Sequence, residues 1–261
     1  MRAMNIAATG MLAQQLNVEV ISNNIANLNT TGFKRQRAEF QDLLYQNERQ
    51  GGANTNDTGT VVPVGVQIGV GVKAAAVYRV NQQGNLVQTS NSLDVAIQGR
   101  GFFQVTQSDG TTVYTRAGSF QLSPTGEMVT ADGLIVQPGL TIPATATSVS
   151  INSSGQVQAT IAGATTPQNV GTLELANFPN EAGLQALGNN LLQQTAASGT
   201  ATTGAPGSVG FGQLQQGFLE TSNVDVVQEI SNLITAQRAY EMNSKVVQAS
   251  NELMQSLNQI R

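Results

Sequence analysis

Apolar residues recur at alternating spacings of three and four along both ends of the chain. At the front, the stripe comprises Met4, Ala7, Met11, Gln14 as one polar member, Val18, Ile21, Ile25 and Leu28. This spacing places side chains on one side of a helix and is typical of amphipathic and coiled-coil helices. The pattern therefore predicts a helix that ends near Leu28, before the turn-forming residues 29–32.

The rear of the chain carries a broader apolar face. One stripe comprises Ala239, Met242, Val246, Ala249, Leu253, Ser256 and Ile260, and a second, at intervals of seven, comprises Val226, Leu233, Tyr240, Val247 and Met254. Both predict a helix over 223–260. Ser222 and Asp225 have the spacing of a capping box at its start. Because two such ends need partners, the chain is predicted to be a polymer subunit, with an ordinary helical hairpin as the alternative.

The middle of the chain is predicted to be short strands and turns. Strands at 102–106 and 112–116 flank Ser108-Asp109-Gly110, and strands at 119–122 and 128–130 flank Pro124-Thr125-Gly126. Both patterns are typical of hairpins. Further strands are predicted at 64–72, 73–80, 93–97, 141–166 and 172–176, with a loop at 198–210.

The predicted fold class is α+β. A discontinuous helical coiled-coil domain is expected from residues 1–45 and 217–261, with a second, shorter amphipathic segment at 33–45. Residues 46–72 are expected to be an extended linker, because glycine, asparagine and threonine dominate their first part. Residues 73–216 are expected to form a central all-β domain of short antiparallel strands.

Composition excludes several functions. The chain has no Cys, His or Trp, so thiol nucleophiles, Ser-His-Asp triads and the usual zinc sites are excluded. No Lys or Arg lies between Arg116 and Arg238, which argues against nucleic-acid binding. The longest apolar run, 74–78, is too short to span a bilayer. We expect no cofactor, no metal, no membrane insertion and no cleavable signal.

Two patterns suggest chemistry, and both have a simpler interpretation. Gly99-Arg100-Gly101 and Gly69-Val70-Gly71 look like parts of phosphate-binding loops, but neither has a third glycine that opens a helix. Glu127 and Asp132 form a candidate carboxylate pair for glycan hydrolysis. Their neighbours Gly126 and Gly133 favour turns instead. The alternatives to a polymer subunit are thus a cell-wall glycan hydrolase and a β-rich adhesin with a helical stalk.

Three blocks of sequence resemble those of bacterial flagellar rod and hook proteins. Residues 22–35 read SNNIANLNTTGFKR, and their motif positions are Asn23, Asn24, Ala26, Asn27, Gly32 and Phe33. Residues 94–105 (DVAIQGRGFFQV) and 114–120 (YTRAGSF) form the second block, and residues 220–225 (ETSNVD) followed by 237–241 form the third. Within the family the chain resembles the distal rod subunits most, because GFKRQR at 32–37 leads into FQDLLYQ at 40–46 and then a polar segment.

The resemblance implies a hollow helical tube in which the terminal helices line the inner wall and the β domain faces outward. Such a tube serves as a drive shaft across the periplasm and as an export conduit. Its implied partners are other copies of the chain, proximal rod subunits, the hook subunit, surrounding periplasmic and outer-membrane ring proteins, the rod-assembly cap and the flagellar type III export apparatus. A proximal rod or hook-type subunit is the alternative within the family.

The assembly contacts are predicted to lie on the two stripes. The chosen residues are Met4, Met11, Val18, Ile21, Ile25, Leu28, Val226, Leu233, Tyr240, Val247 and Met254. The resemblance also implies that residues 46–63 make additional contacts that keep the tube straight.

Overall fold

A computed structural model describes residues 2–49, 64–163 and 166–259. The chain divides into two compact units. Unit 1 comprises Met1–Ile25, Gln36–Tyr78 and Asp225–Arg261, and unit 2 comprises Ala26–Arg35 and Arg79–Val224. Helices occur in the first and short antiparallel strands dominate the second, so the predicted α+β class is confirmed.

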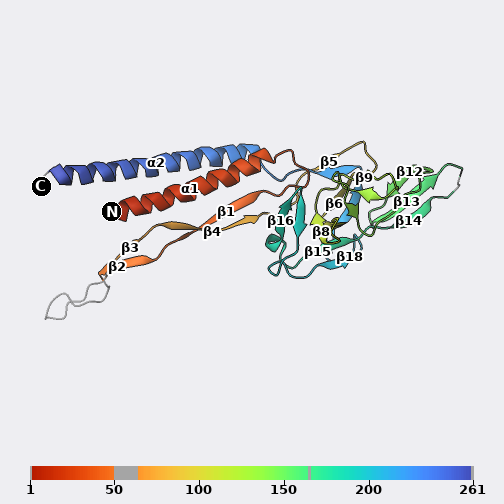
Figure 1. Cartoon of the computed structure of the whole chain (residues 1–261), viewed down its shortest axis with the longest axis horizontal. Coiled ribbons are helices and arrows are strands. Elements are labelled where there is room, and N and C mark those ends of the chain that lie inside the picture. The colour runs from red at the N-terminus through yellow and green to blue at the C-terminus, as the bar shows by residue number, and fades with distance from the viewer. Residues whose placement is uncertain (1, 50–63, 164–165, 260–261) are drawn as a thin grey trace. The chain divides into compact units, whose positions relative to one another are not determined.

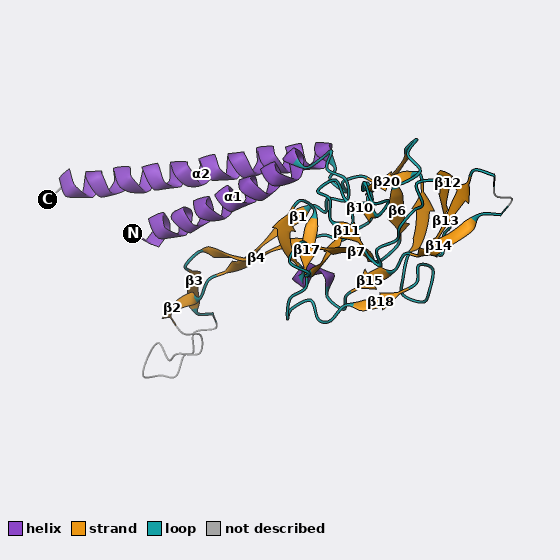
Figure 2. Cartoon of the chain, turned by 45° about the vertical axis from the view of Figure 1, so that its right-hand side comes forward, coloured by secondary structure: helices purple, strands orange, loops and turns teal. Residues whose placement is uncertain are grey.

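The two terminal helices lie side by side in unit 1 (Figures 1 and 2). They are α1 (Arg2–Ala26) and α2 (Val226–Gln259). A Cβ atom at Gly10 would lie 2.9 Å from Nδ2 of Asn243, so the two helices approach each other closely here and a larger residue would displace the Asn243 side chain. The two predicted helices are confirmed. Within the described residues, neither is long and apolar enough to cross a membrane.

The start of α2 differs in detail from the predicted capping box. Asp225 is the capping residue, because its Oδ1 accepts hydrogen bonds from the backbone N–H groups of Val227 and Gln228 at 3.0 and 3.3 Å. The Ser222 hydroxyl accepts instead from the N–H of Val224 at 3.4 Å, ahead of the helix. The cap is thus the residue directly before the first helical turn, where orphan N–H groups are in reach.

Unit 1 also contains four strands. The first two lie in the region predicted as an amphipathic segment and the start of a linker, and the other two lie at the strands predicted at 64–72 and 73–80. The four strands are β1 (Gln36–Asp42), β2 (Tyr45–Arg49), β3 (Val66–Gly69) and β4 (Val72–Arg79), with β1 paired to β4 and β2 antiparallel to β3. Exposure along β1 largely alternates from residue to residue, which is the period of a strand and not of a helix. Residues 50–63 of the predicted linker lie outside the described residues.

Unit 2 contains the remaining strands and one 3-10 helix, η1 (Glu181–Gly183). The strands are β5 (Leu86–Gln88), β6 (Val95–Gln98), β7 (Phe102–Thr106), β8 (Thr112–Thr115), β9 (Gln121–Leu122), β10 (Met128–Val129), β11 (Ile135–Val136), β12 (Ala146–Ile151), β13 (Gln156–Ile161), β14 (Gln168–Thr172), β15 (Leu175–Asn177), β16 (Gln185–Gly188), β17 (Leu191–Gln193), β18 (Thr202–Gly204), β19 (Gln213–Gln216) and β20 (Phe218–Glu220).

The main sheet of unit 2 has the strand order β16-β17-β8-β7-β11-β10-β9, and β15 joins it by pairing with both β7 and β18. Strands β12, β13 and β14 form a second sheet, while β6 pairs with β19 and β5 with β20. Both predicted hairpins are confirmed, as β7–β8 and β9–β10. The predicted loop at 198–210 is wrong in part, because β18 lies within it and pairs with β15.

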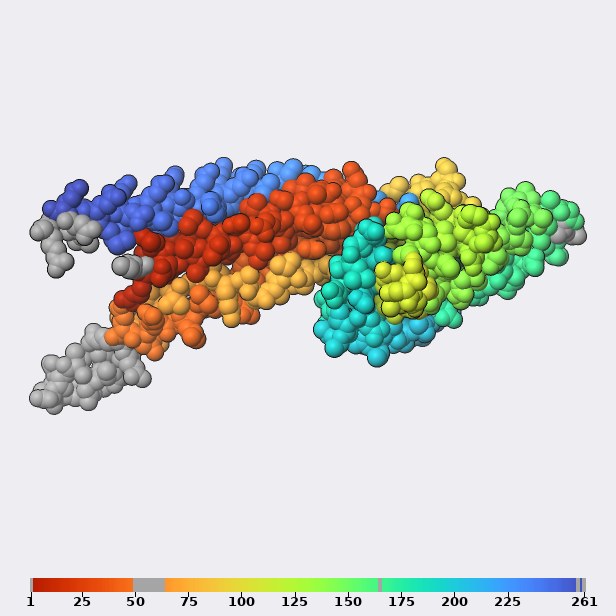
Figure 3. Space-filling view, viewed as in Figure 1, coloured from red at the N-terminus to blue at the C-terminus, as the bar shows by residue number. Residues whose placement is uncertain are grey.

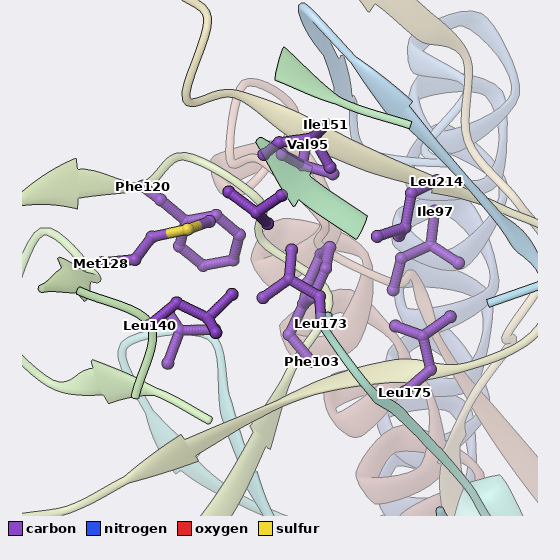
Figure 4. Packing of buried hydrophobic residues seen from close by; sticks show 12 residues of the cluster. Val95, Ile97, Phe103, Phe120, Met128, Leu140, Ile151, Leu173, Leu175 and Leu214 are labelled. Atoms are coloured by element: carbon purple, nitrogen blue, oxygen red, sulfur yellow. The ribbon is translucent and has the colours of Figure 1, made fainter. Parts of the chain in front are cut away.

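The main core of unit 2 is aliphatic with an aromatic pair at its centre (Figure 4). Phe103 and Phe120 pack edge to face with ring centroids 5.0 Å apart. The other fully buried members come from several strands: Val95, Ile97, Met128, Val136, Val157, Leu173 and Leu175. Side chains from distant parts of the sequence thus pack into one core cluster of unit 2.

A matched pair of leucines tests this core. Leu173 is 1% exposed and Leu187 is 44% exposed. Leu173→Ala is expected to lower the free energy of unfolding by about 2–5 kcal/mol, because it removes buried methyl groups and leaves a cavity. Leu187→Ala is expected to change it by less than about 1 kcal/mol. Urea unfolding followed by circular dichroism measures both, and equal effects would contradict the assigned core.

Candidate functional site

A buried group of charges lies where the three sequence blocks meet in unit 2. Glu220, in β20, is 1% exposed. Its Oε2 accepts a hydrogen bond from Nε of Arg116 at 2.6 Å, and its Oε1 accepts from Nζ of Lys34 at 2.5 Å. The backbone N–H of Gly84 also donates to Oε1, at 2.9 Å. We call Lys34, Arg116 and Glu220 the ion cluster.

The Gly99-Arg100-Gly101 segment encloses the Arg116 side chain. Nη1 of Arg116 donates to the carbonyl of Gly101 at 2.5 Å, and Nη2 donates to those of Gly99 and Ile97 at 2.6 and 3.0 Å. The φ angles of Gly99 and Gly101, +108° and +135°, are conformations that other residues rarely adopt. Carbonyl oxygens attract cations, so this segment holds a guanidinium and not a phosphate.

Burial and the neighbouring charges have opposite effects on the pKa values of Glu220 and Lys34. Burial alone raises the pKa of the Glu220 carboxyl, but the charges of Arg116 and Lys34 and their hydrogen bonds outweigh it, so the pKa lies below its ordinary value. Burial lowers the pKa of the Lys34 amine, and Glu220 offsets only part of that effect. The site therefore favours the ionised form of Glu220. For Lys34, burial makes the charged form less favourable, and the Glu220 carboxylate offsets part of that cost.

A ring of three hydrogen bonds lies next to the ion cluster. The N–H of Arg35 donates to Oδ1 of Asn223 at 2.7 Å, Nδ2 of Asn223 donates to the carbonyl of Val80 at 2.8 Å, and the N–H of Val80 donates to the carbonyl of Arg35 at 2.9 Å. Nδ2 of Asn223 also donates to the carbonyl of Gln82 at 2.9 Å. We call Arg35, Val80 and Asn223 the hydrogen-bonded ring.

Gly32 of the first block fits tightly into unit 2. Its N–H donates to the carbonyl of Glu220 at 2.8 Å, and its φ is +69°. A Cβ atom here would lie 2.8 Å from the nitrogen of Ala117 and 2.9 Å from the carbonyl carbon of Arg116. Both backbone conformation and space therefore require glycine.

The Asn24 side chain connects three elements of unit 1 by hydrogen bonds. Its Oδ1 accepts from the N–H of Gln36 at 2.8 Å, and its Nδ2 donates to the carbonyl of Gln36 at 2.9 Å and to Oε2 of Glu229 at 3.3 Å. This single buried side chain thus joins α1, β1 and α2. Of the other motif residues, Asn23 and Ala26 are exposed, while Asn27 and Phe33 are partly buried.

Most of the predicted assembly residues are at least partly covered within the chain. Ile21 is buried, and the residues of intermediate exposure are Met4, Met11, Val18, Ile25, Leu28, Val226, Leu233, Val247 and Met254. Only Tyr240 counts as exposed. The role of these residues in assembly stays a prediction.

Other apolar residues of α2 are more exposed. One group, the N-terminal patch, is Val227, Ile230 and Ile234, and another, the C-terminal patch, is Met242, Val246 and Leu253. Figure 3 shows α2 lying along α1 with its outer side open to solvent. The first predicted stripe of the rear helix contains the three residues of the C-terminal patch. The predicted stripes do not include the N-terminal patch, although its residues follow the same spacing of three and four in the sequence.

The candidate carboxylate pair does not form a common site. Asp132 lines a cavity with Thr130 and Asn190, and Glu127 is not among the residues that line it. Oε2 of Glu127 instead accepts from the Thr125 hydroxyl at 3.1 Å within its own turn. Among the described residues, no group of three or more His, Cys, Asp or Glu side chains could hold a metal ion.

Family models match the chain in three places. The model described as "Flagella basal body rod protein" matches residues 4–34, "Flagellar hook protein FlgE/F/G D1 domain" matches 96–159, and "Flagellar basal body rod FlgEFG protein C-terminal" matches 215–260. One residue of the ion cluster lies in each match. The fold and these matches define a protein of the flagellar rod and hook class, which confirms the predicted resemblance.

Curated relatives narrow this class. The flagellar basal-body rod protein FlgG of Caulobacter vibrioides is 56% identical over 100% of both chains, and that of Agrobacterium fabrum is 53% identical over 97% of both. FlgG of Bacillus subtilis is 39% identical over 98% of both chains. The chain belongs to the family of the flagellar basal-body rod protein FlgG, whose members are structural subunits of the basal body.

The pKa of Glu220 leads to a prediction for acid stability. Because the folded-state pKa lies below the ordinary value of 4.5, the ionised carboxylate stabilises the fold fully above about pH 4.5, and this contribution is lost as the pH falls through the folded-state pKa. Glu220→Gln is expected to remove that part of the pH dependence. At neutral pH it is also expected to destabilise the fold by about 3–5 kcal/mol, because two cations lose their partner.

Urea unfolding between about pH 3 and pH 7 measures the effect. Glu174→Gln is the matched control, since Glu174 is an exposed carboxylate of the same unit, and it is expected to keep the wild-type pH profile. A Glu220→Gln profile with the wild-type slope would contradict the assignment.

Proposed function

We propose that the protein is a distal rod subunit that polymerises with its own copies into a hollow helical tube. The observation that carries this proposal is the exposed apolar surface of α2, in the N-terminal and C-terminal patches. Clusters of large apolar side chains on a soluble protein mark contact surfaces, because their burial releases water. Membership in a family of rod proteins supports copies of the same chain as the partner.

The two patches lie on different sides of α2. With 3.6 residues per turn, their centres are offset by roughly a third of a turn around the helix axis. A helix that already packs on α1 therefore offers two further contact directions, each suited to a different neighbour. Contacts of unlike surfaces, repeated from copy to copy, build open helical polymers instead of closed dimers.

The tube acts as a drive shaft across the periplasm and as an export conduit. Its further partners are the proximal rod subunits, the hook subunit, the surrounding rings, the rod cap and the export apparatus. The role is structural and needs no enzymatic turnover, which the separate positions of Glu127 and Asp132 support. Residues 46–63, expected to add contacts between subunits, keep that role as a proposal.

Point substitutions in the N-terminal patch test polymerisation. Ile230→Lys and Ile234→Lys, alone and together, are expected to raise the concentration needed for tube formation by at least about 10-fold, because each places a charge in an apolar contact. Gln185→Lys, at an exposed polar position of unit 2 and outside both patches, is the control and is expected to polymerise normally. Electron microscopy and sedimentation of the concentrated protein measure the outcome.

Removal of residues 223–261 is expected to abolish tubes altogether. If the intact chain forms tubes and the double Ile variant forms them equally well, the N-terminal patch is not an assembly surface. If the intact chain forms no tubes at any concentration, spontaneous polymerisation is excluded.

The carboxylates offer a test of the structural role. Glu127→Gln combined with Asp132→Asn is expected to leave swimming speed and rod assembly unchanged, because Asp132 lies in an exposed turn and the partly exposed Glu127 follows the turn at 124–126. Motility in soft agar and electron microscopy of isolated basal bodies provide the readouts. Rods that assemble but fail to cross the cell wall in this variant would favour the hydrolase alternative.

A further inference from the structure

We propose that polar and small residues, and not the apolar stripes, fix the register in which α1 and α2 pair within a subunit of an assembled rod. These residues recur at intervals of seven along each helix. We call them the register seam, and they are Gly10, Asn17 and Asn24 on α1 with Glu229, Ala236 and Asn243 on α2. The proposal rests on the proposed function, because it concerns helices that pair in the assembled rod.

Two contacts at opposite ends of the seam define the same antiparallel register. Nδ2 of Asn24 donates a hydrogen bond to Oε2 of Glu229 at 3.3 Å. A Cβ atom at Gly10 would lie 2.9 Å from Nδ2 of Asn243. The two α1 residues are two intervals of seven apart, and so are the two α2 residues. Both contacts therefore specify one alignment of the helices, although they lie about four helical turns from each other.

Burial distinguishes the seam from the apolar stripes. Among the described residues of α2, the two buried side chains are Glu229 and Ala236, at 3% and 2% exposed. On α1, Asn24 is 1% exposed. No residue of the seam belongs to the stripes that periodicity predicts. The innermost side chains of α2 are thus a carboxylate and a methyl group, and not the large apolar side chains of the stripes.

The apolar stripes cannot select this register by themselves. Their members recur at intervals of three, four and seven, so a shift of one helix by seven residues brings similar apolar side chains back into contact. The seam changes on such a shift. In one direction, Asn24 comes opposite Ala236 and Glu229 lies beyond the end of α1. A carboxylate that is buried in the proposed register thereby loses its Asn24 donor, which is costly.

A shift in the other direction disturbs the packing of the seam. Glu229 then comes opposite Asn17, but Gly10 comes opposite Ala236. Two small side chains that face each other leave a gap between the helices, whereas in the proposed register glycine faces the larger Asn243. The seam therefore discriminates between registers that the stripes leave nearly equal, which is the best-attested use of buried polar residues between helices.

Disulfide trapping in isolated flagellar basal bodies measures the register. The chain has no Cys, and a Cβ atom at Gly10 would lie 3.2 Å from Cγ of Asn243, which is close enough for a disulfide. Gly10→Cys is combined with Asn243→Cys for the proposed register, and with Ala236→Cys or Ser250→Cys for a shift of seven residues in either direction. Mass spectrometry of the oxidised rods quantifies the links. The 10–243 link is expected to exceed each of the other two by at least about 10-fold, the factor for one buried hydrogen bond.

Two variants at one position test the polar contact itself. Glu229→Met removes the acceptor but keeps an unbranched side chain of similar length, and it is expected to reduce the ratio of the 10–243 link to the shifted links by at least about 10-fold. Glu229→Gln is the matched control, because it keeps an acceptor oxygen for Asn24, and it is expected to preserve the ratio. A merely structural role of Glu229 would lower the yield of rods without changing the ratio.

The outcomes separate the register from polymerisation. Equal yields of the three links in rods with native Glu229 would overturn the proposal, and so would an unchanged ratio in Glu229→Met rods. If Glu229→Met subunits do not enter rods, Glu229→Leu takes their place, and the comparison with native Glu229 is decisive by itself. Absence of the unaltered chain from isolated rods would contradict the proposed function instead.

Discussion

The carboxylate of Glu220 is the interaction on which the arrangement of this chain depends. A buried anion is costly by itself, and here two cations and a backbone N–H satisfy it. Because Lys34, Arg116 and Glu220 come from three distant parts of the sequence, one ion cluster fixes the relation between them. Loss of one member leaves the others buried and unpaired, so the cluster behaves as a unit.

The cluster also explains features that are otherwise unrelated. Gly99 and Gly101 turn their carbonyls toward the guanidinium, and Gly32 allows the first block to approach the backbone of Arg116. These glycines serve the geometry of one cation. Lysine at position 116 could not reproduce the set, because an ammonium group is a point charge, whereas the planar guanidinium reaches the carboxylate and three carbonyls in fixed directions.

Periodicity predicted the helices and the hairpins well, because α1, α2 and the turns at 108–110 and 124–126 depend on local sequence. It failed where pairing is long-range: β1 and β18 carry weak local signals, and their partners lie far along the chain. The ion cluster could not be predicted for the same reason. The local sequence does not mark Lys34 as a buried ion, because its carboxylate partner is 186 residues away. The resemblance identified the blocks without showing that they meet.

The position of Glu220 near the end of the chain has a consequence for the order in which the protein can fold. During synthesis, Lys34 and Arg116 emerge long before their counterion, so the growing chain holds two cations that repel each other at the place where the blocks later join. A chain truncated before residue 220 never receives the carboxylate. The ion cluster can therefore form only after residue 220 has been synthesised.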